Sequence, residues 1–271
     1  MFGAGIDLEA ELRKVLPSRY VLTGTLGAGG QGSVYKGSCD GRPAALKVFA
    51  PSTDRRRVER EIDILQRIQC PHLVQVFAAE TVRIMSVEVS LIAYELHTGG
   101  DLMVHLQNSA PGLAPEIVGT IGREVGTALD ALWAHRIVHR DVKPANIVRA
   151  ADDRYVLVDV GLARHLDRSA VSGLGTAPGT PGFMAPEQAD GRRNLTIHAD
   201  AFSLGVTLYF LAAKRHPFQG QQAVIMRRLV PEKLERLRPD MPAPLCRAID
   251  RLLSLRPSNR PNALATEFAN F

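Results

Sequence analysis

Residues 139–146 read His-Arg-Asp-Val-Lys-Pro-Ala-Asn, and this stretch decides how the whole chain is interpreted. It places a carboxylate, Asp141, an ammonium group, Lys143, and a carboxamide, Asn146, within six residues. Such a set suits a reaction in which a base orients a hydroxyl, a cation faces a phosphate and a neutral oxygen binds a hard metal ion. We expect His139 to pack in the core rather than to take part in the chemistry.

A second carboxylate follows in Val158-Asp159-Val160-Gly161, thirteen residues after Asn146. An aspartate at the end of a strand and close to a glycine can reach a metal ion that bridges phosphates, although alone this pattern is only a turn. The separation of thirteen residues is short enough for Asn146 and Asp159 to share one metal site.

A glycine-rich stretch lies at 26–34, with Gly27, Gly29 and Gly32 in a Gly-x-Gly-x-x-Gly pattern. Glycines let backbone N–H groups approach phosphate oxygens, yet the pattern also fits a dinucleotide-binding turn or a plain flexible hairpin. In a dinucleotide-binding turn the last glycine opens a helix. Here it runs into 33–37, which alternates like a strand, so a β-hairpin over a nucleotide is favoured. No Gly-Lys-Ser/Thr follows, which excludes a P-loop.

Lys47 stands in the apolar stretch 44–48 and needs a partner if it is buried. Beside the glycine-rich stretch it is interpreted as a phosphate clamp held by a carboxylate. The helix predicted over 54–69 offers Glu59 and Glu61, and we choose Glu61, which leaves Glu59 as a solvated surface charge.

The order of elements indicates an α+β protein with two lobes. We expect a short helical extension over 1–17, an N-lobe of antiparallel strands with one main helix over 18–96, and a mostly helical C-lobe over 97–271. The predicted elements are a helix at 8–16, strands within 20–49 with a hairpin at Asp40-Gly41, strands at 73–79 and 87–96, a helix at 115–134, short strands at 147–148 and 155–158, and helices from about 198.

Taken in order, these motifs resemble the catalytic domain of eukaryotic-type (Hanks-type) Ser/Thr protein kinases. The stretch 179–187 looks like the end of an activation segment, and 200–205 resembles the helix that supports the catalytic loop. Arg260 looks like the usual partner of Glu187. The resemblance covers about 18–270, and the compact inserts together with the Arg- and Ala-rich composition resemble bacterial members.

The resemblance implies the two-lobed kinase fold, ATP as cofactor and a role for each matching residue. Lys47 would hold the α- and β-phosphates and pair with Glu61. Asp141 would be the catalytic base, and Lys143 would stabilise the transferred phosphoryl group. The residues implied for metal binding, with Mg²⁺ or alternatively Mn²⁺, are Asn146 and Asp159. The residues implied for ATP binding are Gly27, Gly29, Gly32, Val34, Ala45, Lys47, Glu95, His97, Asp101 and Val148.

The same resemblance narrows the substrate to Ser and Thr hydroxyls of proteins, because Lys143 and Thr180 match the Ser/Thr pattern. Thr180 is expected to hydrogen-bond Asp141 and Lys143 rather than to accept phosphate. Autophosphorylation is predicted at Thr176 or Ser172, with Arg140 as a partner for the new charge. The alternative is a catalytically silent ATP-binding pseudokinase, which usually lacks the strand lysine or one of the two key aspartates.

One departure from the family pattern is Val160, which stands where the family normally has Phe. That ring packs between the catalytic-loop histidine and a helix residue, here His139 and Leu65. Valine is smaller, so a looser stack is expected, with more effect on regulation than on chemistry.

Composition sets the remaining expectations. The net charge is +5, but the basic residues are scattered and no aromatic residues accompany them, so no nucleic-acid partner is expected. The three cysteines are far apart in sequence, which favours a reducing compartment over a disulfide framework or a zinc site. No run of eighteen apolar residues and no leader pattern is present, so no membrane segment is expected and a cytoplasmic location is predicted.

Overall fold

The structure is a computed structural model that describes residues 7–29, 32–51, 59, 62–63, 65–107, 109–160, 179–192, 194–227 and 230–271. Three residues predicted for the site, Glu61, Ser172 and Thr176, lie outside these ranges. The chain divides into two compact units. The described residues of unit 1 lie within 7–69 and 74–96, and those of unit 2 lie within 70–73, 97–160 and 179–271.

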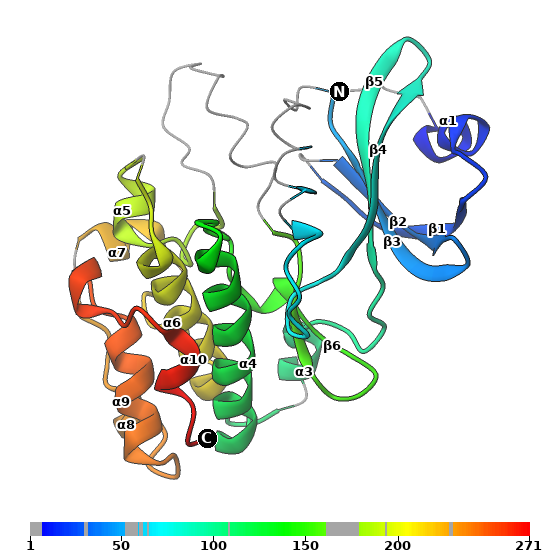
Figure 1. The fold of residues 1–271 in the computed structure, drawn as a ribbon. Coiled ribbons are helices and arrows are strands. Elements are labelled where there is room, and N and C mark those ends of the chain that lie inside the picture. Colours follow the sequence, from blue (N-terminus) through cyan, green and yellow to red (C-terminus); the bar gives the residue numbers. More distant parts are fainter. Residues whose placement is uncertain are drawn as a thin grey trace. The chain divides into compact units, whose positions relative to one another are not determined.

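Unit 1 is built on one antiparallel sheet of five strands (Figure 1). The strands are β1 (Tyr20–Gly29), β2 (Gly32–Cys39), β3 (Arg42–Phe49), β4 (Val76–Ile84) and β5 (Val87–Glu95), in the order β1-β2-β3-β5-β4. Asp40 and Gly41 form the predicted two-residue hairpin, with φ of 49° and 75°. Both values are positive, as a type I′ turn requires, and they explain the Asp-Gly pair.

The strand predicted at 73–79 is wrong in its bounds, since β4 extends to Ile84. The prediction followed an apolar run, whereas the strand continues with alternating burial, in which Val82 and Ile84 face the core and Arg83 is exposed. Period-two alternation therefore marks this strand better than hydrophobicity alone.

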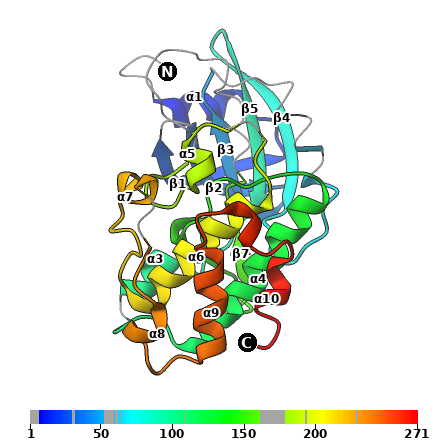
Figure 2. The same cartoon turned by 90° about the vertical axis from the view of Figure 1, so that its left-hand side faces the viewer.

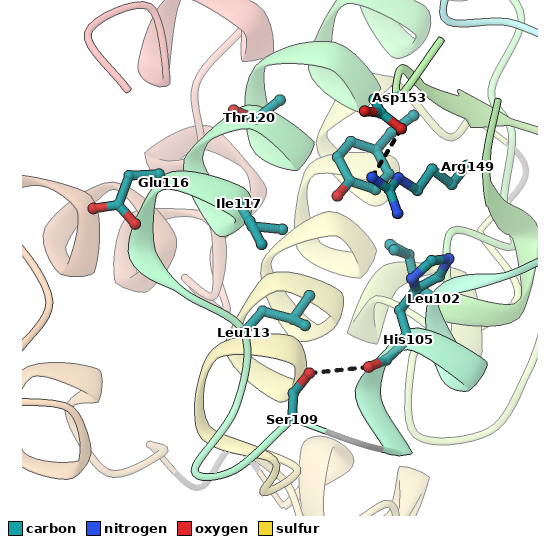
Figure 3. A pocket seen from close by; sticks show the side chains of 10 residues that line it. Leu102, His105, Ser109, Leu113, Glu116, Ile117, Thr120, Arg149 and Asp153 are labelled. Atoms are coloured by element: carbon teal, nitrogen blue, oxygen red, sulfur yellow. Dashed lines mark hydrogen bonds and ion pairs between the residues drawn. The ribbon is translucent and has the colours of Figure 1, made fainter. Parts of the chain in front are cut away.

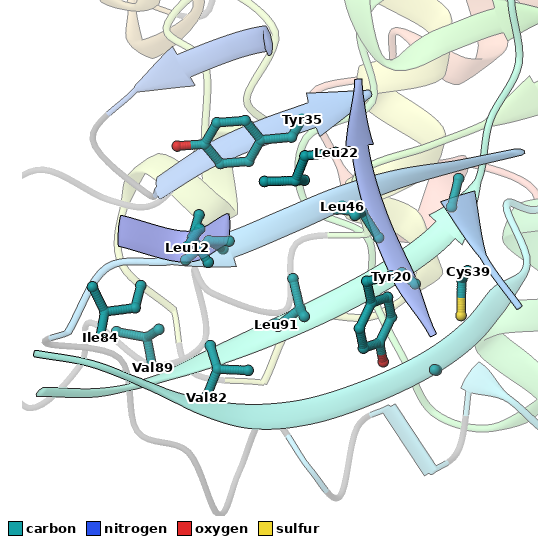
Figure 4. Packing of buried hydrophobic residues seen from close by; sticks show 14 residues of the cluster. Leu12, Tyr20, Leu22, Tyr35, Cys39, Leu46, Val82, Ile84, Val89 and Leu91 are labelled. Atoms are coloured by element: carbon teal, nitrogen blue, oxygen red, sulfur yellow. The ribbon is translucent and has the colours of Figure 1, made fainter. Parts of the chain in front are cut away.

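Helix α1 (Leu8–Val15) closes one end of the core of unit 1. Asp7 caps it by accepting a hydrogen bond from the Ala10 N–H at 3.1 Å. Leu12 is fully buried among side chains of the sheet (Figure 4). Burying one leucine contributes roughly 1.5–3 kcal/mol, so this helix is part of the folded unit.

Unit 2 consists mainly of helices around α4 (Pro115–Ala134) and α6 (Ile197–Ala213), which pack against each other (Figure 2). Helix α6 is buried on all sides along most of its length, as expected for a helix that is hydrophobic all round. The shorter helices are α3 (Leu102–Gln107), α5 (Pro186–Ala189), α7 (Gln222–Met226), α8 (Leu234–Leu237), α9 (Ala243–Leu252) and α10 (Leu264–Glu267), with 3₁₀ turns η1 (Pro144–Asn146) and η4 (Pro257–Asn259).

Two short strands, β6 (Ile147–Arg149) and β7 (Tyr155–Leu157), pair antiparallel in unit 2. A cavity of about 360 Å³ lies beside them, and it contains none of the residues predicted for the site. Its lining is mixed: it includes an ion pair at 2.8 Å between Arg149 and Asp153 and also apolar side chains such as Leu113 (Figure 3). Within the described part of the chain, no helix is long and apolar enough to cross a membrane.

Candidate active site

The loop 139–146 is anchored by a carboxylate from helix α6. Asp200 accepts hydrogen bonds from the backbone N–H groups of His139 and Arg140, both at 2.8 Å. Its side chain is buried, and this burial raises the pKa of the Asp200 carboxyl while the two donors act in the opposite direction. The first turn of a long buried helix therefore holds the loop, as the resemblance predicts for 200–205.

Asp141, Lys143 and Thr180 form a compact cluster of hydrogen bonds. The Thr180 hydroxyl donates to Asp141 Oδ1 at 2.7 Å and accepts from Lys143 Nζ at 2.7 Å. The Thr180 N–H also donates to Asp141 Oδ1 at 3.0 Å, and Lys143 Nζ lies 3.0 Å from Asp141 Oδ2. Both hydrogen bonds predicted for Thr180 are present. A hydroxyl thus lies against the carboxylate and the ammonium group at the same time.

Asn146, in the turn η1, is oriented by the same aspartate. Its Nδ2 donates to the backbone carbonyl of Asp141 at 2.8 Å and to Asp141 Oδ2 at 3.1 Å. Because the amide nitrogen is used in this way, the carboxamide oxygen is the group available to bind a cation. The orientation of Asn146 therefore suits a metal ligand.

Asp159 follows β7 at the end of a chain segment tied to the catalytic loop. The Val158 N–H donates to the carbonyl of Asn146 at 2.9 Å. Asp159 itself has a φ of 57°, which is uncommon for a residue other than glycine. Asn146 and Asp159 offer only oxygen ligands, and this donor set fits Mg²⁺ or Mn²⁺ rather than zinc.

His139 does more than fill space, which the sequence alone did not indicate. The ring is fully buried, and its Nδ1 accepts a hydrogen bond from the Asp141 N–H at 3.3 Å. With Nδ1 as acceptor, Nε2 carries the proton and donates to the carbonyl of Val158 at 3.1 Å. His139 therefore links the backbone at Asp141 to the segment that carries Asp159. Val160, the departure from the family pattern, is buried.

In unit 1, Lys47 lies on β3 and is largely buried, with 8% of its surface exposed. Lys47 pairs with Val34 on β2 in the sheet register. Ala45, two residues before Lys47 on β3, pairs with Lys36 on β2. The ammonium group lies 5.2 Å from the centre of the Phe49 ring. A buried ammonium group at the centre of a sheet needs a compensating partner.

The glycines of the predicted loop differ in whether the fold requires a glycine at that position. Gly32 has a φ of 137°, and a Cβ there would meet the Val48 carbonyl oxygen at 2.0 Å. Gly32 is therefore needed for the β2–β3 packing. A Cβ on Gly27 would meet nothing within 4 Å, so the fold itself does not require this glycine. Gly29 at the end of β1 pairs with Gly32 at the start of β2.

The residues predicted to contact the adenosine part of ATP are divided between the two units. Val34, Ala45 and Glu95 belong to unit 1, and the Glu95 N–H donates to the Gln75 carbonyl at 2.9 Å. The others, in unit 2, are His97, Asp101 and Val148.

Asp101 forms an isolated bridge with Val148, so these two predicted residues lie together. Asp101 Oδ1 also accepts from the Met103 and Val104 N–H groups, at 2.9 and 3.1 Å. The side chain therefore caps helix α3 in addition to any role toward a ligand.

The segment after Thr180 is fastened by a buried ion pair. Arg260 donates to both oxygens of Glu187, at 2.5 and 3.2 Å, as the resemblance predicts. Arg260 also donates to the carbonyls of His198 and Ser254, both at 2.7 Å. Burial lowers the pKa of Arg260, and Glu187 partly offsets this effect.

Comparison with known proteins agrees with this geometry. The model of the protein kinase domain family matches residues 20–269. The serine/threonine-protein kinase PknE of Mycobacterium tuberculosis is 34% identical over 252 residues, which cover 89% of this chain and 43% of PknE. PkaA of Streptomyces coelicolor is 33% identical over 272 residues, covering 91% of this chain and 48% of PkaA. A crystal structure of the M. tuberculosis PknI kinase domain has a TM-score of 0.73 and 28% identity, and the match covers 93% of this chain and 94% of that one. The chain thus spans less than half the length of these two curated relatives.

Proposed function

Because the chain belongs to the protein kinase domain family, we propose that it transfers the γ-phosphoryl group of ATP to Ser and Thr hydroxyls of proteins, with Mg²⁺ or Mn²⁺ as the metal. The observation that carries the proposal is the cluster of Asp141, Lys143 and Thr180. There a threonine hydroxyl donates to the aspartate at 2.7 Å and accepts from the lysine at 2.7 Å. An acceptor hydroxyl needs the same two contacts, a base for its proton and a cation beside the group it attacks.

In the proposed reaction Asp141 orients the acceptor hydroxyl and takes its proton as the oxygen bonds to the γ-phosphorus. The bond from that phosphorus to the β–γ bridging oxygen breaks, and ADP is the leaving group. Lys143 stabilises the negative charge on the transferred group. Asn146 and Asp159 would hold the metal, which neutralises charge on the phosphates when bound. His139 keeps the backbone at Asp141 in place.

The residues proposed to bind the nucleotide are those that the kinase resemblance assigns. In unit 1, Lys47 would contact the α- and β-phosphates with Glu61 as its partner, and the glycine-rich stretch would cover them. Open space around a Cβ at Gly27 supports this, because that glycine then serves a ligand rather than the fold. The kinase resemblance assigns apolar contacts with adenine to Val34, Ala45 and Val148, and polar contacts to Glu95, His97 and Asp101.

Retention of Lys47, Asp141 and Asp159 argues against a catalytically silent ATP-binding module. A phosphate-transfer assay with a generic basic protein tests the proposal. Asp141→Asn should abolish transfer and leave nucleotide binding intact, because the base does not hold ATP. Lys47→Met should weaken nucleotide binding and also abolish transfer. Turnover near the wild-type rate in Asp141→Asn would show that the catalytic assignment is wrong.

Autophosphorylation at Thr176 or Ser172 remains part of the proposal, as both residues lie outside the described ranges. A phosphate adds roughly −1.5 to −2 charge and pairs well with arginine, for which Arg140 is the first partner. Mass spectrometry after incubation with Mg-ATP would locate the sites. Full activity of a Ser172→Ala, Thr176→Ala double variant would contradict this regulation.

We also propose that the reaction takes place in the cytoplasm and that the chain has no nucleic-acid partner. In support of the first point, Cys39, Cys70 and Cys246 are all buried free thiols, as expected in a reducing compartment.

A further inference from the structure

Residues 181–184, which directly follow Thr180, contact the loop 216–221 that precedes α7 and Gln222, the first residue of α7. Gln222 makes two of these contacts with one carboxamide. Its Oε1 accepts from the Gly182 N–H at 3.1 Å, and its Nε2 donates to the Met184 carbonyl at 3.1 Å. The carboxamide therefore bridges two backbone groups of the segment.

Two further contacts hold the same stretch. The Phe183 ring meets the His216 ring edge-on, with centroids 5.3 Å apart, and the Phe183 carbonyl accepts from Ser203 Oγ on α6 at 2.8 Å. Gly182 has a φ of 90°, and a Cβ there would meet the Gly220 carbonyl oxygen at 2.7 Å. The backbones of the segment and the loop are thus in close contact.

Residues 181–184 lie where they can affect binding of the acceptor protein. Thr180 is hydrogen-bonded to both Asp141 and Lys143, so Pro181 is the first residue of the chain beyond these reacting groups. Consecutive Cα atoms are about 3.8 Å apart, so the segment 181–184 begins next to the acceptor site, although its residues Gly182 and Met184 are buried. Pro181 is exposed, and an acceptor peptide that presents its hydroxyl to Asp141 must pass beside it.

On the basis of the proposed function, we propose that Gln222 is a positioning residue for the protein acceptor. It fixes the position of residues 181–184 beside the place where the acceptor chain binds, and it has no part in nucleotide binding. The Gln222 carboxamide accepts from Gly182 and donates to Met184 at the same time. A glutamate of the same shape would accept from Gly182 and place a charged oxygen against the Met184 carbonyl.

The test compares steady-state kinetics of wild type, Gln222→Glu, Gln222→Ala and the control Gln221→Ala. Gln221 precedes α7, is exposed and makes no capping hydrogen bond with its side chain. The measurements are KM for a generic basic protein, KM for ATP, and ATP hydrolysis without acceptor. Loss of one hydrogen bond should raise the acceptor KM about fivefold in Gln222→Glu, and loss of both should raise it about 25-fold in Gln222→Ala. KM for ATP and the hydrolysis rate should stay at wild-type values.

The outcomes separate this inference from the proposed function. If wild type and Gln221→Ala transfer phosphate and both Gln222 variants match them in acceptor KM, the positioning role is refuted and the kinase assignment stands. A parallel rise in KM for ATP would also refute it, because the loop would then act on the whole site. If wild type transfers no phosphate in the presence of Mg-ATP, the proposed function itself fails. Gln222→Glu keeps the side-chain volume, so the test holds even if Gln222→Ala does not fold.

Discussion

The buried pair of Arg260 and Glu187 provides the sharpest test of how unit 2 is held together. The Arg260 side chain is completely buried, and that of Glu187 is 9% exposed. Replacing Arg260 with methionine removes the charge but keeps much of the volume. The Glu187 carboxylate would then be buried without its cation, and the carbonyls of His198 and Ser254 would each lose a donor.

Breaking a buried pair by removing one partner costs about 3–5 kcal/mol, because an uncompensated charge remains. We therefore expect Arg260→Met to lower the free energy of unfolding of unit 2 by about 4 kcal/mol. With an m-value of about 2 kcal/mol/M, the urea midpoint would fall by about 2 M. Replacing both residues, Arg260→Met with Glu187→Leu, removes the stranded charge and should recover more than half of the loss.

The assay is urea unfolding followed by the fluorescence of Trp133, the only tryptophan of the chain, which lies on α4 in unit 2. Arg251 supplies the matched control, because it pairs with Glu267 at 2.9 Å but is 56% exposed. Arg251→Met should cost at most about 1 kcal/mol. The reasoning fails if Arg260→Met costs no more than this control, or if the double variant is no more stable than Arg260→Met.

Three further predictions concern the metal, the core and pH. Chelation with EDTA should stop transfer and added Mg²⁺ should restore it, because Asn146 and Asp159 offer oxygen ligands only; activity that persists in EDTA would count against the site. Val160 is buried, so Val160→Phe should overpack and lower the stability by ~1–3 kcal/mol, whereas an unchanged melting temperature together with an unchanged rate would show that the smaller residue has no consequence. Burial lowers the pKa of His216 to about 4, below its usual value near 6.5. The unfolded chain therefore binds this proton more readily, and the stability present above about pH 6.5 is lost as the pH falls toward 4. His216→Gln should flatten that slope in unfolding experiments between these pH values, and a slope equal to wild type would contradict the assignment.

Much of the site could be predicted because its chemistry lies in short stretches of sequence. Asp141, Lys143 and Asn146 stand within six residues, so a single turn of the chain is enough to bring them close together. The hairpin at Asp40-Gly41 was predictable for the same reason, since its positive φ values depend on two adjacent residues.

Other features needed the tertiary structure, because their partners are far apart in sequence. Gln222 reaches Gly182 across forty residues, and nothing in the sequence around Gln222 indicates that contact. His139 was predicted only to pack, and its link between Asp141 and Val158 depends on how β7 lies against the loop.

By itself, then, the sequence determined which reactive groups are present, in what order, and the local backbone that presents them. Packing decided which of these groups are held in place and by what. Helix α6 is buried on nearly all sides, and this burial brings Asp200 beneath the backbone of His139, sixty-one residues earlier in the chain. The physical reason is that local conformation depends on neighbouring residues, whereas a buried polar group must be satisfied by whichever partner the folded core brings within hydrogen-bonding distance.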